Sequence, residues 1–422
     1  MNKHDGTSTH WLWAICAAQV PMMFVYANYV AALPLFKAEW NLTNVQAGTI
    51  YTAFYVGYIL AAAVLATATD YMSAKKIYLA SSLWLALLNF MFPLLADGFV
   101  SASVFRGLTG VGLAGTYAPA LRLVAEYAPE GRRARMVGIY TFFYTVGVAT
   151  SIYVTGALVA NFEWRTAFAL TSLGPAAGFL AMVFLLPALP SPRRDGDAGF
   201  ELPRLPAPVW VLIGVVGAHR WEVFAFRGWI VTFLAASLVM TGTETRESAL
   251  QVASSAAAMI IGLSAVSKLI GGWFADRIGR PPTIIASLFL SGLISVSIGL
   301  AFGTPFAILQ ILCLIWVIVM HVDAPVLVVL TTELTPRRHL GSALGIQSGL
   351  GFLLGSLAPM VVGIFLDMSN DSSTGELPLN WDWAFIGPGV AAILGGVATI
   401  LVARRYMGGE VPQEDGAEVS RP

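Results

Sequence analysis

Long apolar runs alternate with short polar stretches along almost the whole of this 422-residue chain. A helix needs about 20 mostly apolar residues to cross the hydrocarbon core of a bilayer. Backbone polar groups must be bonded internally in that core, so uninterrupted runs of this length predict helices. The pattern predicts twelve membrane-spanning helices, at residues 11–36, 45–69, 77–96, 101–125, 136–160, 166–189, 207–239, 248–275, 282–302, 305–333, 341–367 and 382–404.

Composition supports an all-α membrane protein. Hydrophobic residues make up 57% of the chain and charged residues 11%, against about 25% charged residues in soluble domains. The polar N-terminus runs straight into the first apolar segment without a small-residue cleavage site, which predicts a retained span and not a signal peptide. The net charge is zero and gives no indication of a nucleic-acid partner.

The sequence offers no sign of a metal, a cofactor or an enzyme. Its two cysteines, Cys16 and Cys313, lie in apolar runs and predict neither a disulfide framework nor a metal site. We find no phosphate-binding loop and no nucleophile–base motif. The class of function is therefore sought among membrane proteins that bind small molecules.

Lysine and arginine set the expected orientation. Sixteen of the 24 such residues fall in segments on the same side as the N-terminus, three fall on the opposite side, and five lie inside predicted spans. Basic loops stay in the cytoplasm. Both termini are therefore predicted to be cytoplasmic.

Two short patterns recur at nearly one offset. Glu126-Tyr-Ala-Pro129 follows the fourth span and Glu333-Leu-Thr-Pro336 follows the tenth, while aspartate-containing loops follow the second and the eighth. Such repeats predict two six-helix bundles in parallel orientation. The predicted domains are 1–189 and 207–405, joined by a proline- and charge-rich cytoplasmic linker at 190–206 and followed by a disordered tail at 406–422.

The loop after the eighth span resembles a known family motif. Gly272-Trp-Phe-Ala-Asp276-Arg277-Ile-Gly279-Arg280 is similar to G-x-x-x-D-R-x-G-R of the major facilitator superfamily. The resemblance implies alternating access by two bundles around a central cavity lined by the first, fourth, seventh and tenth spans. It also implies gating roles for Asp276, Arg277, Arg280 and, in a degenerate first copy, Asp70. For that copy a simple topology-setting loop is the alternative.

The seventh span carries a group of charged residues that are costly to place in a bilayer. His219-Arg220-Trp221-Glu222 and Arg227 lie inside it, and each charged group at the bilayer centre costs about 2.5–3.5 kcal/mol. The default interpretation is that these groups face a cavity and bind something. The alternative is an internal Arg–Glu pair that only holds helices together. Counted from Pro208, Arg220 lies roughly 18 Å along the helix, near the midplane, and Arg227 roughly 28 Å along, near the outer interface.

A second resemblance concerns the class of transporter. Gly115-Thr-Tyr117-Ala-Pro119-Ala-Leu121-Arg122, together with the charged stretch of the seventh span and Arg227-Gly-Trp229, resembles bacterial permeases grouped with nitrate/nitrite and cyanate transporters. This implies a multi-pass protein of the bacterial inner membrane. The fifth span lacks the Gly-Pro pair typical of drug/proton antiporters, which argues against efflux.

Fixed positive groups outnumber deep acids inside the spans, which favours an anionic substrate. Arginine binds a planar carboxylate through two parallel hydrogen bonds. Arg220 is the first candidate for this role and Arg122 the second, and Arg227 is a further candidate. Other side chains could close over an organic substrate, although core packing is the commoner role of such aromatics: Tyr26, Asn28, Tyr55, Tyr144 and Trp221.

Uptake of an anion needs an energy source. Moving it inward against a negative-inside potential costs about 2.3 kcal/mol per charge per 100 mV, and a co-transported proton removes that cost. The candidate proton carriers are Asp323, Glu222, His321 and His219. Burial disfavours a charged carboxyl and a nearby arginine favours it, so a substrate that occupies the arginine releases the acid to take a proton. Glu222 could instead pair with an arginine, and His321 could serve packing alone.

The leading hypothesis is a monomeric symporter that takes up a small organic anion with protons. An efflux antiporter for amphipathic compounds is the alternative. A non-transporting receptor would need a folded soluble domain, which the pattern does not predict.

Overall fold

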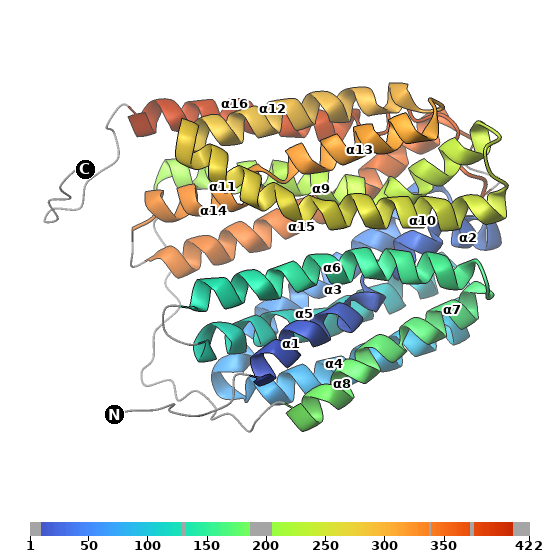
Figure 1. Ribbon diagram of the computed structural model, residues 1–422, viewed down its shortest axis with the longest axis horizontal. Coiled ribbons are helices and arrows are strands. Elements are labelled where there is room, and N and C mark those ends of the chain that lie inside the picture. The colour runs from blue at the N-terminus through green and yellow to red at the C-terminus, as the bar shows by residue number, and fades with distance from the viewer. Residues whose placement is uncertain (1–9, 129–131, 186–204, 337–338, 372–374, 408–422) are drawn as a thin grey trace, which may run out of the picture.

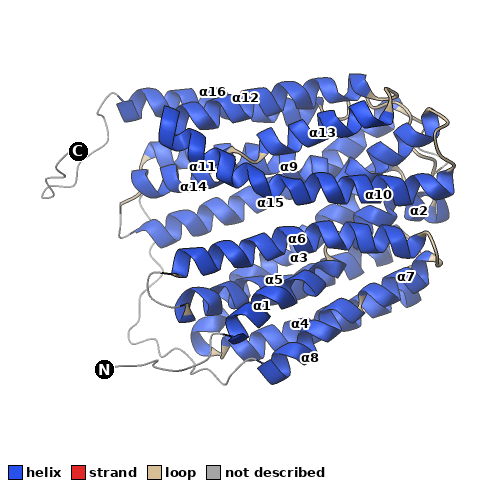
Figure 2. Ribbon diagram, in the orientation of Figure 1, coloured by secondary structure: helices blue, strands red, loops and turns tan. Residues whose placement is uncertain are grey.

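The structure is a computed structural model that describes residues 10–128, 132–185, 205–336, 339–371 and 375–407. Within these residues the chain is helical and contains no strand (Figure 2). Eleven helical stretches of the described chain are long and apolar enough to cross a membrane. The helix over the fourth predicted span is comparably long but falls short in apolarity, because Arg106 and Arg122 lie within it.

The helices of the first half correspond to the first six predicted spans. The first span contains α1, η1 and α2, and the sixth contains α7 and α8. The elements are α1 (His10–Met22), η1 (Met23–Val25), α2 (Asn28–Trp40), α3 (Asn44–Tyr71), α4 (Ala74–Leu95), α5 (Phe99–Tyr127), α6 (Arg133–Val159), α7 (Trp164–Thr171) and α8 (Leu173–Leu185).

The second half begins with the longest helix and repeats the same general plan. The eighth predicted span contains α10, η2 and α11, and the tenth contains α13 and α14. The elements are α9 (Ala207–Met240), α10 (Arg246–Leu263), η2 (Ser264–Val266), α11 (Ser267–Ile278), α12 (Arg280–Ile298), η3 (Gly299–Ala301), α13 (Phe306–Met320), α14 (Asp323–Leu334), α15 (Leu340–Ser369) and α16 (Ile386–Met407).

The helices lie side by side, with α1 and α3–α8 on one side and α9–α16 on the other, and α2 lies next to α10 at the right of the view (Figure 1). The two sides meet along α3 with α15, α6 with α10 and α2 with α9. One end carries Arg133, Arg277 and Arg280 and is called the basic end (left in Figure 1). The other, where α9 turns into α10, is called the opposite end.

Several predicted spans are broken instead of continuous. Proline explains two of the breaks. Its ring clashes with the carbonyl group of the residue four positions earlier, and its nitrogen has no hydrogen to donate. Pro325 lies four residues after His321, where α13 ends, and Pro175 lies four residues after Thr171, where α7 ends. The predicted spans identified the length of these segments but not their interruption.

The break in the first span is stabilised by side chains from other helices. Arg106 is fully buried and donates hydrogen bonds to the carbonyl oxygens of Val25 (3.0 Å) and Tyr26 (3.1 Å). Ser151 accepts a hydrogen bond from the Ala27 amide (3.2 Å). Backbone groups that leave a helix must find partners in a water-poor interior. These contacts therefore fix the position at which the first span bends.

The opposite end is closed by a capping contact between the two sides. Asp367 of α15 accepts hydrogen bonds from the backbone amides of Asn44 (2.8 Å) and Val45 (2.9 Å), the first two residues of α3. Thr43 and Gln46 form a reciprocal capping box at the same helix start. A helix N-terminus has unpaired donors and a partial positive charge. The carboxylate of one half thus completes a helix of the other.

The glycines of α5 and α15 differ in whether they lie at close helix contacts. A Cβ at Gly110 of α5 would lie 1.9 Å from the carbonyl oxygen of Phe54, so glycine is required where α3 and α5 touch. Gly345 and Gly349 of α15 have no atom within 4 Å of that position. These two face open space at the basic end and serve no packing there.

The predicted linker 190–206 and tail 406–422 lie almost entirely outside the described residues, which resume at residue 205 and end at residue 407.

Candidate functional site

A cavity of about 360 Å³ lies between the two sides of the molecule. Its walls come from the break in the first span, from α3, α5 and α6, and from α9, the η2–α11 segment, the α13–α14 break and α15. The lining of α15 includes Ser348 and Phe352, next to the open face at Gly345 and Gly349. The first, fourth, seventh and tenth spans line it as predicted, and the second, fifth, eighth and eleventh complete it.

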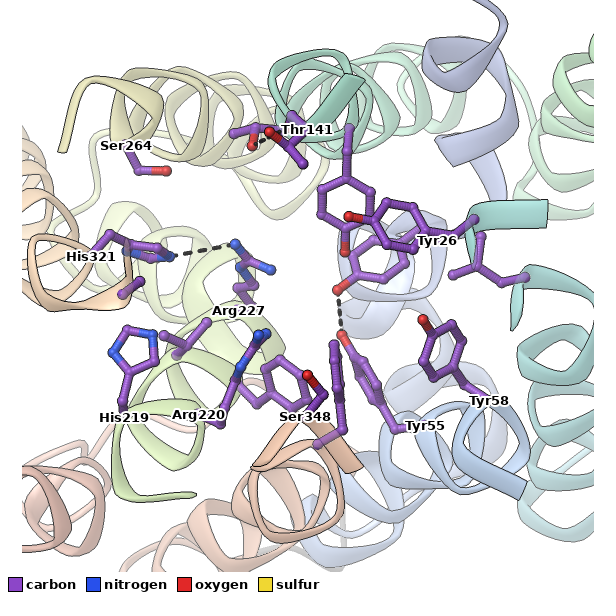
Figure 3. A pocket seen from close by; sticks show the side chains of 18 of the residues that line it. Tyr26, Tyr55, Tyr58, Thr141, His219, Arg220, Arg227, Ser264, His321 and Ser348 are labelled. Atoms are coloured by element: carbon purple, nitrogen blue, oxygen red, sulfur yellow. Dashed lines mark hydrogen bonds between the residues drawn. The ribbon is translucent and has the colours of Figure 1, made fainter. Parts of the chain in front are cut away.

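One wall of the cavity is cationic (Figure 3). The guanidinium of Arg220 lies over the ring of Phe352 at 4.4 Å, and Nη2 of Arg227 lies 3.4 Å from Nε2 of His321. Lys268 also lines the cavity. Within the described part of the chain, neither arginine forms an ion pair with a carboxylate. Two strong donors are therefore available to a ligand.

Helix α9 positions both arginines. It begins after Pro206, with proline also in its first turn, and continues unbroken for 34 residues. Arg220 and Arg227 are seven residues apart and share one face. Both line the same cavity, and their predicted depths in the bilayer stay predictions.

An acid and two imidazoles lie beside the arginines. Nδ1 of His219 is 3.0 Å from Oδ1 of Asp323, without the geometry of a hydrogen bond, and both side chains are buried. The His321 ring lies 6.0 Å from the His219 ring and its Nδ1 is 2.9 Å from the Val317 carbonyl oxygen. The break before Pro325 brings His321 and Asp323 to this place. The cluster connects Arg227 with a buried carboxylate.

The facing wall is made of tyrosines (Figure 3). The hydroxyls of Tyr51 and Tyr55 are 3.0 Å apart and those of Tyr55 and Tyr26 are 2.5 Å apart. Tyr144 packs edge-on against Tyr26, with ring centroids 5.9 Å apart. The Tyr55 ring stacks on Phe224 of α9 at 4.3 Å and so joins the two sides. Cations and phenols thus face each other across the cavity.

Sequence comparison identifies the family. The sequence profile of the Major Facilitator Superfamily matches residues 15–246 and 242–421, which together cover nearly the whole chain. The chain belongs to the Major Facilitator Superfamily. The superfamily predicted from the loop motif is confirmed, and the protein is a multi-pass membrane transporter and not an enzyme.

Relatives of this transporter include carriers of organic anions. It is 24% identical to the 4-hydroxybenzoate transporter of Acinetobacter baylyi, over 74% of this chain and 76% of that protein. It is 25% identical to the cis,cis-muconate transport protein of the same organism, over 79% and 81%. It is 26% identical to the chloroplastic ascorbate transporter of Arabidopsis thaliana, over 81% of this chain, and spans 62% of the length of that relative.

Solved structures agree on the fold. A bacterial homologue of the human lysosomal transporter Spinster, in an inward-facing and occupied conformation, superposes with a TM-score of 0.77 at 16% identity, over 97% of this chain and 100% of that one. A D-xylose–proton symporter gives a TM-score of 0.72 at 15% identity, over 93% and 97%. Identities this low show the fold alone.

Five of the predicted substrate-binding and proton-coupling residues lie away from the cavity lining. Glu222 is fully buried and accepts hydrogen bonds from Ser291 of α12 (2.9 Å) and Trp316 of α13 (2.7 Å). It pairs with no arginine, and it does not share the cavity face with His219. The amide of Asn28 is fully buried in the first bundle, where it donates to Asn89 (2.8 Å). The remaining three are Arg122, Trp221 and Asp323, the last of which lies behind His219.

The predicted gating residues lie at the basic end. Arg280 forms an ion pair with Glu333 of α14 at 2.8 Å. Arg277 lies over the ring of Trp273 at 3.9 Å, and Asp276 is exposed. Asp70 belongs to the last turn of α3, but its side chain lies outside the described residues.

Sequence reasoning missed the contribution of α15 to the site. Ser348 and Phe352 line the cavity, and small residues at 345 and 349 lie on the same helical face. Positions three and four apart are neighbours on a helix. Phe352 is the single aromatic residue on this face of small residues, and this pattern was the signal in the sequence that could have indicated a cavity wall. Among the described residues, no cluster of three His, Cys, Asp or Glu side chains could hold a metal ion.

Proposed function

We propose that the transporter takes up a small organic anion of the carboxylate type together with protons, by alternating access. The observation that carries this proposal is the pair of arginines, Arg220 and Arg227, on a cavity wall without a carboxylate partner. A buried charge without a counter-ion is costly. A bound carboxylate supplies that counter-ion and accepts two parallel hydrogen bonds from a guanidinium.

The relatives support an anionic substrate. Two of them are named for 4-hydroxybenzoate and cis,cis-muconate, both of which are carboxylates. The lining residues offer no carboxylate that would attract an amphipathic cation. We therefore place efflux of amphipathic compounds second.

Proton coupling is assigned first to the Asp323–His219 contact, with His321 between it and Arg227. An anion bound to Arg220 and Arg227 cancels part of the positive field on this group, which favours proton uptake. When the loaded transporter then turns toward the cytoplasm, the bound proton offsets the negative charge of the anion. Less net charge therefore moves against the membrane potential. Glu222 is the second candidate carrier, because its carboxylate is fully buried.

The proposal includes the architecture. With α5 counted, the chain forms twelve spans in two six-helix bundles, residues 1–189 and 207–405. By the distribution of positive charge the basic end and both termini face the cytoplasm, so the cavity opens inward. Asp70, Asp276, Arg277 and Arg280 then belong to the cytoplasmic gate. We place a monomer in the bacterial inner membrane.

The first experiment is a thermal-shift screen of the purified protein with benzoate, cis,cis-muconate, glucuronate, nitrate and an amphipathic cation. A ligand at about 100 times its Kd adds about 2.7 kcal/mol of apparent stability. We expect shifts with carboxylates that disappear in Arg220→Ala and persist in Arg165→Ala, a control arginine that pairs with Glu39 at the opposite end. Shifts from the cation alone, unchanged in Arg220→Ala, would refute the anion site and favour the efflux antiporter.

Proton coupling is tested in proteoliposomes that contain a pH-sensitive dye. Addition of the carboxylate found in the screen should acidify the lumen with the wild-type protein. Asp323→Asn should keep substrate binding and lose acidification. Full acidification in both Asp323→Asn and Glu222→Gln would contradict the assignment.

A further inference from the structure

We propose that the substrate carries its carboxylate on a single aromatic ring, and that the Tyr26 hydroxyl recognises a polar substituent on that ring. This inference rests on the proposed function, since it concerns the same cavity. It goes further by naming the class of carboxylate and the residue that selects it.

The first step is the composition of the walls. Eight of the 21 lining residues are phenylalanine or tyrosine. Aromatic rings attract one another through offset or edge-on contacts beyond the effect of area alone. Tyr55 and Phe224 present such faces from the two sides of the molecule, and their stacking at 4.3 Å holds both rings in place. A cavity of about 360 Å³ lies at the small end of ligand pockets, which run from about 300 to 1,000 Å³.

The second step is what the walls lack. Among the lining residues there is no Asn, Gln, Asp or Glu. A sugar acid brings several hydroxyl donors, and each donor that enters a buried site without an acceptor costs free energy. The aliphatic hydroxyls of the lining, on Thr141, Thr145, Ser264 and Ser348, offer few acceptors for such a ligand. A benzoate-like ring brings no donors, so these walls favour it over a hexuronate.

The third step is the orientation of the guanidinium. Arg220 lies over the ring of Phe352 at 4.4 Å, which fixes its plane by a cation–π contact. A carboxylate that accepts two parallel hydrogen bonds from one edge of this guanidinium is held in a defined direction. Figure 3 shows the tyrosines on the opposite side of the cavity from Arg220 and Arg227. The ring of a bound substrate therefore extends toward the phenols.

The fourth step is a count of hydroxyl protons. Tyr51, Tyr55 and Tyr26 have three hydroxyl protons and form two hydrogen bonds with one another. Tyr26 and Tyr55 line the cavity, whereas Tyr51 does not. Either hydroxyl of each pair can be the donor. A chain that runs from Tyr51 through Tyr55 to Tyr26 leaves the Tyr26 proton for a ligand, and the reverse chain leaves a lone pair of the Tyr26 oxygen for it. Arg106 donates a hydrogen bond to the Tyr26 carbonyl oxygen (3.1 Å) and so keeps the Tyr26 backbone in place.

The test compares four acids in binding measurements on the purified transporter: benzoate, 4-hydroxybenzoate, cyclohexanecarboxylate and glucuronate. We expect benzoate to bind roughly fivefold tighter than cyclohexanecarboxylate, which has the same charge and nearly the same size. We expect 4-hydroxybenzoate to bind roughly fivefold tighter than benzoate, as one hydrogen bond provides. Glucuronate should bind weakest.

Two variants isolate the Tyr26 hydroxyl. Tyr26→Phe should remove the preference for 4-hydroxybenzoate over benzoate, so that the ratio of the two affinities falls from roughly fivefold to about one. Tyr78→Phe is the matched control, because it removes a buried tyrosine hydroxyl of the same bundle at a position that does not line the cavity. An unchanged preference in Tyr26→Phe would overturn the assignment of that residue.

The outcomes separate this inference from the proposed function. Equal binding of benzoate and cyclohexanecarboxylate, or tighter binding of glucuronate, would overturn the aromatic inference while the anion site stands. Binding of all four acids that is unaffected in Arg220→Ala would overturn the proposed function itself.

Discussion

The contact of Asp367 with the start of α3 predicts how the opposite end opens. Its carboxylate accepts hydrogen bonds from the Asn44 amide and side chain through Oδ1 and from the Val45 amide through Oδ2. In Asp367→Ala all three are lost, and two backbone donors at the helix start remain without partners. In Asp367→Asn the bonds to Oδ1 can persist, but the new NH₂ group faces the Val45 amide, which is also a donor.

The magnitude follows from these bonds. A hydrogen bond to a charged group contributes about 1.5–3 kcal/mol, and leaving its buried partner unpaired is costly. The three bonds share one carboxylate at a partly exposed site, so they do not add fully. We expect a loss of about 3 kcal/mol in Asp367→Ala, which is about a hundredfold shift from the closed to the open form of this end. Asp367→Asn should lose about half as much.

Cysteine labelling measures this shift. Thr52 donates a hydrogen bond to the Ser356 carbonyl oxygen across the α3–α15 interface (2.6 Å), and Thr52→Cys places a reporter there. The two native cysteines are buried and give a low background. Maleimide labelling should rise steeply when Asp367→Ala is added and stay low with Asp382→Ala, an exposed acid at the same end. Unchanged labelling in a folded Asp367→Ala protein would refute the reasoning.

Three further changes test the packing around the site. Arg106→Gln should lower the thermal stability of the purified protein by about 3 kcal/mol, because freed carbonyl groups lose a charged donor; an unchanged melting temperature would contradict this. Glu222→Gln should change stability by less than about 1 kcal/mol, whereas Glu222→Leu, which leaves the Trp316 N–H unpaired, should cost about 1–3 kcal/mol in the same assay. Gly57→Val should abolish the monodisperse peak in size-exclusion chromatography, since a Cβ there lies 1.9 Å from the Gly107 carbonyl oxygen; a normal peak would show that the helices can separate.

Hydrophobic run length predicted the helices well because every membrane-spanning segment obeys the same requirement of length and internal hydrogen bonding. It could not locate the breaks, which depend on partners from other helices. The first span bends where Arg106 and Ser151 can bind the freed backbone groups. The tenth bends before Pro325, a signal that was present in the sequence but compatible with a continuous kinked helix.

The sequence also did not predict which polar residues line the cavity and which lie inside a helix bundle. His219 and Glu222 are three residues apart on α9, yet one lines the cavity and the other binds Ser291 and Trp316. Tyr26 lines the cavity, whereas Asn28 two residues later belongs to a network inside the first bundle. Helical spacing states which residues lie near one another on a helix, but it does not state what each face meets.

By itself the sequence determined the helical membrane fold, the superfamily and the unusual charges of the seventh span, because run length, a loop motif and the cost of buried charge are local properties. Only the tertiary structure decided which of the polar residues share one cavity. In a membrane protein lipid and core are equally apolar, so hydrophobicity does not distinguish the inner from the outer face of a helix. In the most apolar stretch of α9, 83% of the residues are buried, so protein surrounds almost every face of this helix. The neighbours that distinguish those faces come from distant parts of the chain.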